Sequence, residues 1–272
     1  MITWLETIGV VFIAVAGVTL GRFISSFRKP WWFLGYLFPC ILIAILALAR
    51  CKNVMYFTEP FSWIAAGRCR FVVISLAVTM GLTVPLSRLP SKLEKILVCI
   101  LMVIFVTWFS VLPFFAPVLI KKHLSNLKTR FDSDGICRQS TSYTCGPAAA
   151  VTALGKLGLT AEEGEIAVLS YTSPIAGTLP VCLSSALQHR YGASGLKCRY
   201  RSFKSVKQLK GTGIILAIVR DALLLDHCLA VLEISENKVT VADPVTGVRS
   251  MSYEQFEKIW RYSGIVISRD TI

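Results

Sequence analysis

Four long apolar stretches fill most of the first 120 residues, and they limit what this chain can fold into more than any other feature. They lie at residues 2–24, 31–49, 71–86 and 96–120. A helix of about 20 apolar residues crosses the roughly 30 Å hydrocarbon core of a bilayer. We therefore predict a transmembrane bundle of about four helices in residues 1–122.

The first and third stretches have competing interpretations. A signal peptide needs a basic start, a short apolar core and a small-residue cleavage site. Residues 1–6 contain no basic residue, and three further apolar stretches follow, so we interpret the first stretch as a retained helix. The third stretch is the shortest and contains Pro85, and residues 61–67 either extend it or lie in the membrane interface.

Charges in the loops indicate how this bundle is oriented, because cytoplasmic loops carry the excess of Lys and Arg. Eight basic residues lie on the side of both termini, at positions 50, 52, 68, 70, 121, 122, 128 and 130, and six lie on the other side. This bias predicts a multi-pass protein with its C-terminal domain in the cytoplasm. The central parts of the stretches contain no acidic residue, which favours an anchor or a platform for a partner over an ion pathway.

Composition excludes other function classes. The net charge is +13, but residues 1–122 supply +9 of it, from 12 Lys and Arg against 3 Asp and Glu, in short segments between apolar stretches. Nucleic-acid-binding domains instead gather basic residues on one soluble face, so we predict no nucleic-acid partner. The nine cysteines and three histidines show no disulfide or zinc spacing, so we expect free thiols in a reducing compartment, no metal and no cofactor.

The sequence after about residue 123 is that of a soluble domain. Helices are predicted first, at 145–157, 162–171 and 180–191, followed by strands at 214–219, 228–234, 238–242 and 265–268 and a helix at 252–261. Helices followed by strands are typical of an α+β domain, and about 140 residues can bury a core of their own. We therefore predict an α-helical membrane domain in residues 1–122 and an α+β domain in residues 123–272.

Cys145 is the first residue whose position suggests chemistry. It begins a predicted helix, with Gly146 and Pro147 in the first turn. The dipole and free N–H groups of a helix N-terminus favour a thiolate, which is the nucleophile of cysteine catalysis. Gln139, six residues upstream, can join the Cys145 N–H as a donor to an oxyanion. Taken singly, a buried structural cysteine and a solvated loop glutamine are the commoner interpretations.

His227 and Asp243 lie at the ends of two predicted strands. A histidine there can act as general base and acid, and a carboxylate one strand over can orient its imidazole. Sixteen residues separate the two, enough for two strands and a tight turn, so an antiparallel hairpin brings them near each other. The structural alternatives are a histidine that caps a strand and an ordinary Asp-Pro turn.

The order Gln, Cys, His, Asp at this spacing resembles the papain-like cysteine peptidases that cut double-glycine leader peptides from bacteriocins and related peptides. The resemblance covers about residues 134–268. It rests on QSTSYTCGPA at 139–148, Gly177-Thr178, Asp226-His227, DPVTG at 243–247 and the aromatic helix at 253–260.

The resemblance implies a role for each of these residues. Cys145 would be the nucleophile, His227 the base and Asp243 the orienting acid, with Gln139 as the oxyanion donor and with Gly177 and Thr178 in substrate binding. A peptide substrate and a separate transporter are the partners it implies, and the apolar stretches add the lipid bilayer as a partner. The chain departs from the family pattern, because its peptidase part follows the membrane part and no G-x-x-x-x-G-K-[ST] motif occurs.

The sequence thus predicts a membrane-anchored cysteine peptidase that processes the leader or precursor of an exported peptide. Two other functions stay open. An acyl- or peptidyl-transferase, or a deamidase, uses the same Cys-His-Asp order. A non-catalytic module would instead hold a leader peptide for a secretion system without cutting it.

Overall fold

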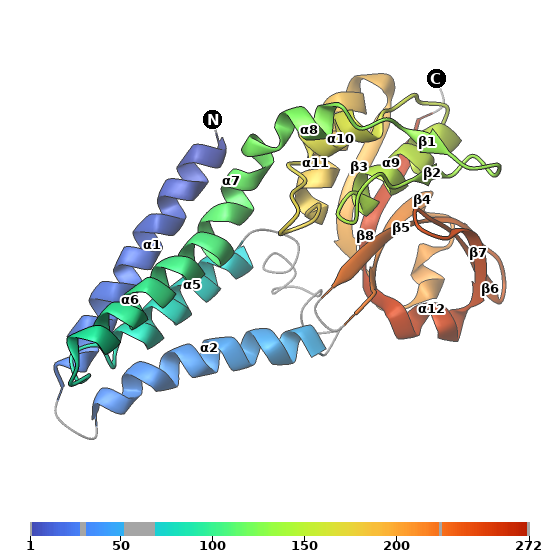
Figure 1. Ribbon diagram of the computed structural model, residues 1–272. Helices are drawn as coiled ribbons and strands as arrows, with labels where there is room; N and C mark the ends of the chain where they lie inside the picture. Colours follow the sequence, from blue (N-terminus) through green and yellow to red (C-terminus); the bar gives the residue numbers. More distant parts are fainter. Residues whose placement is uncertain (1, 28–30, 52–68, 223–224, 271–272) are drawn as a thin grey trace. The chain divides into compact units, whose positions relative to one another are not determined.

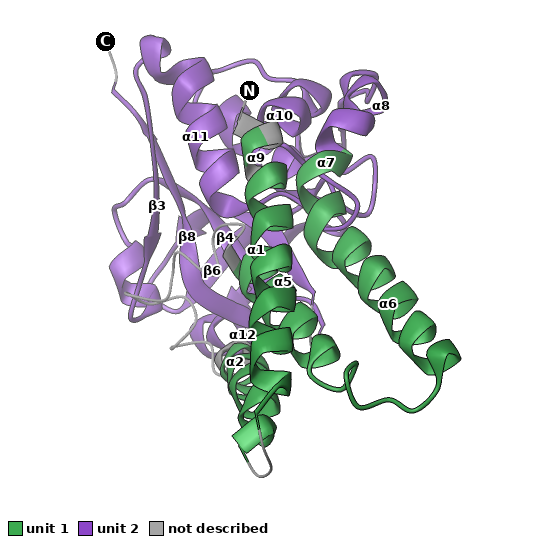
Figure 2. Cartoon of the chain, turned by 90° about the vertical axis from the view of Figure 1, so that its left-hand side faces the viewer, with its two compact units in different colours: residues 1–50, 68–116 green, residues 51–67, 117–272 purple. Residues whose placement is uncertain are grey.

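The structure is a computed structural model, and it describes residues 2–27, 31–51, 69–222 and 225–270. The chain divides into two compact units (Figure 2). The first, which we call the helical unit, comprises residues 1–50 and 68–116, and the second, the peptidase unit, comprises residues 51–67 and 117–272. The domain boundary predicted at residue 122 stays a prediction.

The helical unit is built from the apolar stretches of the sequence (Figure 1). Its elements are α1 (Ile2–Ser25), the 3-10 turn η1 (Trp31–Phe33), α2 (Leu34–Cys51), α5 (Cys69–Thr83) and α6 (Lys92–Val106), which continues through the π-helical turn η2 (Thr107–Val111) into α7 (Leu112–Leu119). Three segments of the described chain are long and apolar enough to cross a membrane, at Thr7–Ser25, Trp31–Leu48 and Lys92–Leu119.

The third predicted stretch is shorter than expected. Helix α5 has 15 residues and ends at Thr83, two residues before Pro85, which cannot continue the backbone hydrogen bonds of a helix interior. The described apolar helix Arg70–Thr83 is therefore below spanning length. The interfacial segment predicted at residues 61–67 lies outside the described residues.

Helices α1 and α5 pack closely through small residues. Gly17 and Gly21, four positions apart on α1, face Thr79 and Thr83 of α5, and a Cβ added to Gly21 would lie 2.8 Å from the Cβ of Thr83. The threonine hydroxyls donate within α5, from Thr79 Oγ1 to the Ser75 carbonyl at 2.7 Å and from Thr83 Oγ1 to the Thr79 carbonyl at 2.6 Å. Such small-residue contacts are typical of helix packing in lipid, where backbone approach replaces hydrophobic burial.

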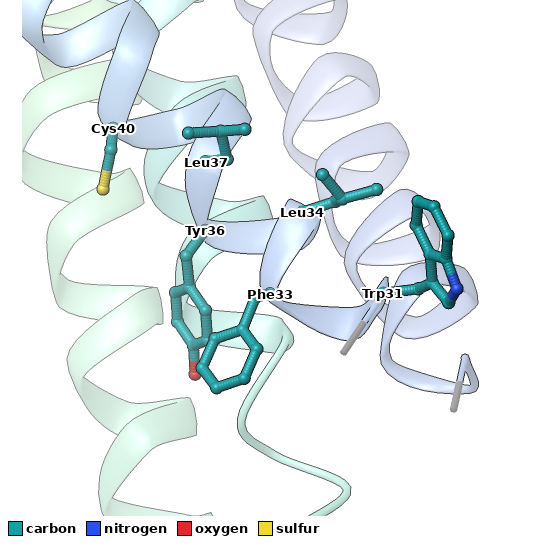
Figure 3. Close-up of a pocket in the computed structure, with 6 residues that line it drawn as sticks. All are labelled: Trp31, Phe33, Leu34, Tyr36, Leu37 and Cys40. Carbon is teal, nitrogen blue, oxygen red and sulfur yellow. The ribbon is translucent and has the colours of Figure 1, made fainter. Parts of the chain in front are cut away.

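The beginning of α2 presents an apolar surface. An open hollow of about 500 Å³ is lined by Trp31, Phe33, Leu34, Tyr36, Leu37 and Cys40 (Figure 3). Most of these side chains are exposed. Aromatic residues at the end of an apolar span are typical of the interface between lipid and water. The hollow is therefore a surface suited to contact with lipid.

The peptidase unit is an α+β domain built around one six-stranded antiparallel sheet. Its strands occur in the order β3 (Leu196–Ser202), β8 (Trp260–Arg269), β4 (Ile214–Arg220), β5 (Asp226–Ile234), β6 (Lys238–Asp243) and β7 (Gly247–Ser252). A small hairpin, β1 (Arg130–Phe131) and β2 (Cys137–Arg138), precedes the helices α9 (Cys145–Lys156), α10 (Glu163–Leu169) and α11 (Pro180–Tyr191). Helix α8 (Lys121–Ser125) comes before the hairpin, and α12 (Tyr253–Ile259) lies between β7 and β8.

The two faces of this sheet carry separate cores. Helices α9 and α11 cover one face, where Ala149, Leu154 and Leu187 pack against Ile218 and Ile265. Helix α12 covers the other face (Figure 1). There Trp260 is fully buried, with its ring centroid 5.6 Å from that of Phe203 and 5.3 Å from that of Phe256. Two apolar cores make the sheet a rigid base for side chains at the strand ends.

Most predicted elements of this unit agree with the structure, and the differences have two causes. The helix predicted to end at residue 261 ends at Ile259, because Trp260 pairs with Val219 and begins β8. Strands β3 and β7 were missed. Both lie at the sheet edges and carry charged or polar residues, such as Arg199 and Arg249, which weaken the apolar pattern of a strand.

Candidate active site

Cys145 lies at the N-terminus of α9, as predicted. The helix packs across β5, and the side chains of its first turns are small and fully buried, with Ala148 and Ala149 at the contact with the sheet. A Cβ added to Gly146 would lie 3.0 Å from the Cβ of Thr178, so only glycine fits comfortably next to the cysteine. The thiol itself is partly exposed. A buried, closely packed helix thus holds Cys145 at an accessible end.

His227 and Asp243 lie on neighbouring strands of one antiparallel hairpin. Ala230 pairs with Ala242, and the two functional residues stand at the open end of this β5–β6 ladder. His227 Nε2 is 2.9 Å from Asp243 Oδ1. The predicted hairpin is confirmed, and it places the imidazole in hydrogen-bond contact with the carboxylate.

The Asp243 carboxylate is almost fully buried, and both of its oxygens have partners. Oδ1 also accepts the Val245 N–H at 2.8 Å, and Oδ2 accepts a hydrogen bond from Arg249 Nη2 at 2.7 Å. Burial by itself raises the pKa of this carboxyl, but the hydrogen bonds from His227 and Val245 hold the pKa well below its usual range. Asp243 is therefore ionised, and it presents a fixed negative charge to His227.

The charge on His227 follows from its two neighbours. Burial lowers the pKa of the imidazole, but hydrogen bonds with Asp243 and with Cys145 raise the pKa to about 10. An imidazole with this pKa carries its second proton at neutral pH. The structure thus brings Cys145, His227 and Asp243 into one hydrogen-bonded chain, in which the imidazole lies between the cysteine sulfur and the carboxylate.

Gln139 follows β2 and is connected to the same hairpin. Its backbone N–H donates to the Pro244 carbonyl at 3.2 Å. Its side-chain Oε1 is buried and has no hydrogen-bond partner within the described residues. The amide oxygen is thus buried without a partner among the described residues, which is unusual away from functional sites. The role of Gln139 as an oxyanion donor stays a prediction.

Gly177 and Thr178 form a turn that lies against Gly146. Gly177 has a φ of +64°, and its backbone exchanges hydrogen bonds of 3.0 and 2.9 Å with Ser173. Thr178 Oγ1 is 2.7 Å from Thr172 Oγ1, and its Cβ lies against Gly146. Thr178 is therefore next to the first turn of α9. The role of both residues in substrate binding stays a prediction.

Arg249 and Glu163 are site residues that the sequence did not indicate. Arg249 reaches Asp243 from the edge strand β7, and a basic residue six positions after an Asp-Pro turn was the only signal for it. Glu163 is fully buried at the beginning of α10 and accepts hydrogen bonds from Ser140. No local pattern marks it, because its partner lies 23 residues earlier in the chain.

The described residues contain no cluster of three His, Cys, Asp or Glu side chains that could hold a metal ion. The thiols of Cys145, Cys137, Cys198 and Cys228 are free. The expectation that no metal or organic cofactor takes part stays a prediction.

A cysteine at a helix N-terminus, opposite a histidine and an aspartate at strand ends on an α+β scaffold, defines a cysteine peptidase of the papain-like class. Residues 134–271 match the Peptidase C39 family. This range is slightly more than half of the 272 residues, and the chain belongs to that family. The predictions of a papain-like peptidase fold and of a cysteine peptidase are confirmed.

Similar proteins occur among curated sequences and solved structures. An uncharacterized protein of Methanothermobacter thermautotrophicus is 29% identical over 143 residues, which are 53% of this chain and 94% of that protein. One of Methanothermobacter marburgensis is 28% identical over 145 residues, which are 53% of this chain and 96% of that protein. The peptidase domain of Streptococcus ComA, a bi-functional ABC transporter involved in quorum sensing, is 20% identical, with a TM-score of 0.43 over 49% of this chain and 96% of that domain. A double glycine motif protease from an AMS/PCAT transporter, solved with its leader peptide, is 13% identical, with a TM-score of 0.41 over 53% of this chain and 95% of that protease.

Proposed function

We propose that this protein is a membrane-anchored cysteine peptidase that hydrolyses a peptide bond in the leader or precursor of an exported peptide. Cys145, His227 and Asp243 form its catalytic triad. The observation that carries the proposal is the position of His227, which is hydrogen-bonded to Asp243 at 2.9 Å and is also in contact with Cys145. This is the geometry in which an imidazolium stabilises a thiolate nucleophile.

The first half of the reaction forms a thioester. The Cys145 thiolate attacks the carbonyl carbon of the scissile bond, and the oxygen becomes an oxyanion that the Cys145 N–H and the Gln139 amide stabilise. His227 then gives its proton to the leaving amine as the tetrahedral intermediate collapses. Asp243 keeps the imidazole ring oriented and stabilises its positive charge throughout.

The second half hydrolyses the thioester. His227, now neutral, removes a proton from a water molecule that attacks the thioester carbonyl. The second tetrahedral intermediate expels the Cys145 thiolate and releases the new carboxylic acid. His227 is protonated again, so the thiolate–imidazolium pair is restored, and no metal or organic cofactor is used.

The helical unit gives this chemistry its location. Three segments that are long and apolar enough to cross a membrane support an anchor in the bilayer, and the excess of Lys and Arg in the loops supports a cytoplasmic peptidase unit. The resemblance to the double-glycine peptidases implies that the substrate is a leader peptide and that a separate transporter exports the product. A cytoplasmic site next to the membrane is suited to a precursor on its way to export.

The test measures alkylation of Cys145 against pH by mass spectrometry, in the full-length wild type and in His227→Ala. We expect rapid labelling near pH 6 that is lost in His227→Ala, because a histidine-paired thiol ionises far below the usual value of about 8.5. His189→Ala is the matched control, because His189 is exposed on α11. Equal, slow labelling in all three proteins would contradict the triad and favour a non-catalytic module that only binds a leader peptide.

Product analysis then separates hydrolysis from transfer. The full-length protein is incubated with a peptide that contains a double-glycine sequence, in the presence of an added amine nucleophile. Hydrolysis yields a new carboxylate at the cleavage site, whereas a transferase yields an amide with the added amine. We expect the carboxylate, and an adduct as the main product would assign the protein to the transferases.

A further inference from the structure

A fully buried carboxylate holds the loop that carries Gln139. Glu163 Oε1 accepts the Ser140 backbone N–H at 2.8 Å, and Glu163 Oε2 accepts the Ser140 Oγ–H at 2.6 Å. Within the described residues Glu163 forms no ion pair. A buried carboxylate is costly unless its oxygens are satisfied, and here both oxygens are directed to one residue. Glu163 therefore fixes the backbone and the side chain of Ser140 together.

Ser140 directly follows Gln139, so this contact also constrains the predicted oxyanion donor. On its other side, the Gln139 N–H is fixed by the Pro244 carbonyl, one residue after Asp243. The backbone of Gln139 is thus held at both ends, whereas its buried Oε1 has no partner among the described residues. An oxyanion donor is effective only when it is held in place before the charge develops.

The support of Glu163 comes from outside the region that matches the family. The Glu163 N–H donates to Thr129 Oγ1 at 2.8 Å, and the Thr129 hydroxyl donates to the carboxylate of Glu162. Ser140 Oγ also lies 3.3 Å from the Lys128 carbonyl oxygen, although its one proton is directed to the shorter contact with Glu163. Residues 124–130, which we call the junction segment, lie between the last apolar span, ending at Leu119, and residue 134, where the family match begins.

The backbone of the junction segment is in close contact with the beginning of α10. Leu124 is fully buried. A Cβ added to Gly164 would lie 2.5 Å from the Leu124 carbonyl oxygen and 3.1 Å from that of Leu127. Only glycine permits this approach, so the backbone of the junction segment and the beginning of α10 form one rigid contact directly beside Glu163.

We propose that Glu163 is a positioning residue for Gln139, and that the junction segment, through Thr129, is part of the active-site support. The proposal rests on the proposed function, in which Gln139 stabilises the oxyanion. Glu163 touches neither the substrate nor the reacting atoms, and it acts through Ser140. Proteolysis therefore depends on the chain segment that leaves the membrane as well as on the peptidase fold.

A double-mutant cycle on the full-length protein tests the link between Glu163 and Gln139. Glu163→Gln puts an amide N–H opposite a Ser140 donor, and we expect kcat to fall about 10-fold with little change in KM. This is less than the roughly 10²–10³-fold fall for complete loss of one oxyanion donor, because Gln139 would be misplaced and not removed. In the Gln139→Ala background, Glu163→Gln should have no further effect on kcat. Rates are expressed per reactive Cys145, counted by alkylation, so that loss of folded protein does not imitate loss of rate.

Matched variants separate positioning from general destabilisation. Glu165→Gln makes the same change on the same helix at a half-exposed carboxylate, 2.6 Å from Arg190, and should leave kcat unchanged. If Glu163→Gln does not fold, Thr129→Val removes the acceptor of the Glu163 N–H and should lower kcat about 3-fold, toward the low end for a lost hydrogen bond of 0.5–1.5 kcal/mol. Thr160→Val, the same change at an exposed threonine outside the junction segment, is its control.

The outcomes distinguish this proposal from the proposed function. An equal fall in kcat for Glu163→Gln in the presence and absence of Gln139 would overturn the positioning role while leaving the triad intact. A Gln139→Ala protein with wild-type kcat would remove the oxyanion assignment, and the positioning role with it. After either of these two outcomes, loss of activity in Cys145→Ala would still support the proposed peptidase function.

Discussion

The helical unit and the peptidase unit place their large apolar side chains in opposite ways. On α1 the Phe12 side chain is 73% exposed, and on α6 Leu93 and Val103 are also exposed. In the peptidase unit Trp260 and Phe256 are fully buried between sheet and helix. The contrast agrees with the membrane location that we propose for the helical unit, because lipid tails solvate apolar side chains as well as a protein core does.

Their buried polar groups differ as well. In the helical unit the buried hydroxyls of Thr79 and Thr83 donate to carbonyls of their own helix, which satisfies them locally. In the peptidase unit several buried polar residues, such as Glu163 and Asp243, join segments that are separate in the chain. Arg261 Nε, for example, is 2.9 Å from Asp226 Oδ1, next to His227. Buried polar groups that connect distant segments are expensive to maintain, and here they surround the candidate active site.

The largest expected effect separates the chemical roles of the two units. Cys145→Ala removes the nucleophile and should lower kcat by about 10⁴-fold or more, while membrane insertion and the fold of both units stay unchanged. The fall in kcat is measured by peptide cleavage with the full-length protein. Membrane insertion is measured by extraction, because an inserted protein is released by detergent but not by carbonate. Full activity without this thiol would end the assignment of the peptidase site.

A matched pair of truncations tests the difference in solvent directly. Trp260→Ala empties a buried site and should destabilise the peptidase unit by about 3–5 kcal/mol. Phe12→Ala shortens a side chain that is already exposed, and we expect the free energy of unfolding to change by less than about 0.5 kcal/mol. Pulse proteolysis in urea gives both values. A large effect of Phe12→Ala would mean that this face of α1 packs against protein rather than lipid.

The pH profile shows how the buried charges of the peptidase unit act. The pKa of His227 is raised from 6.5 to about 10, so its protonated form stabilises the fold fully below pH 6.5, and this contribution is lost as the pH rises through about 10. The alkaline limb of activity should therefore lie far above pH 6.5. Asp243→Asn removes one cause of the raised pKa of His227. The alkaline limb of activity should therefore move toward lower pH, and kcat should fall. Rates measured from about pH 5 to 11 test both effects. A profile that does not move would show that Asp243 does not set the charge of His227.

The smallest effect is expected at the contact between α1 and α5. Gly21→Leu adds a side chain whose Cβ alone would lie 2.8 Å from the Cβ of Thr83. We expect this crowding to destabilise the helical unit by about 1–3 kcal/mol. Gly9→Leu is the control on the same helix, because nothing lies within 4 Å of a Cβ at Gly9. The midpoint of thermal aggregation in detergent compares the two. Equal midpoints would contradict close packing of these helices.

The sequence by itself determined the elements whose signals are local. The apolar runs predicted four spans, of which three are long enough in the structure to cross a membrane. The helix start at Cys145 and the β-branched strands around His227 and Asp243 predicted the scaffold of the site. These predictions succeed because helix length, helix N-termini and hairpin spacing depend on residues that are close together in the chain. The resemblance to a peptidase family then connected the separate signals.

Only the tertiary structure decided which groups hold the site together. Ser140 and Glu163 are 23 residues apart, Thr129 and Glu163 are 34 apart, and Arg249 reaches Asp243 from an edge strand that the sequence did not reveal. Trp260 begins a strand instead of ending a helix, because its ring fills the core between Phe203 and Phe256. Such contacts depend on how distant segments pack, and the local sequence pattern carries no record of that packing.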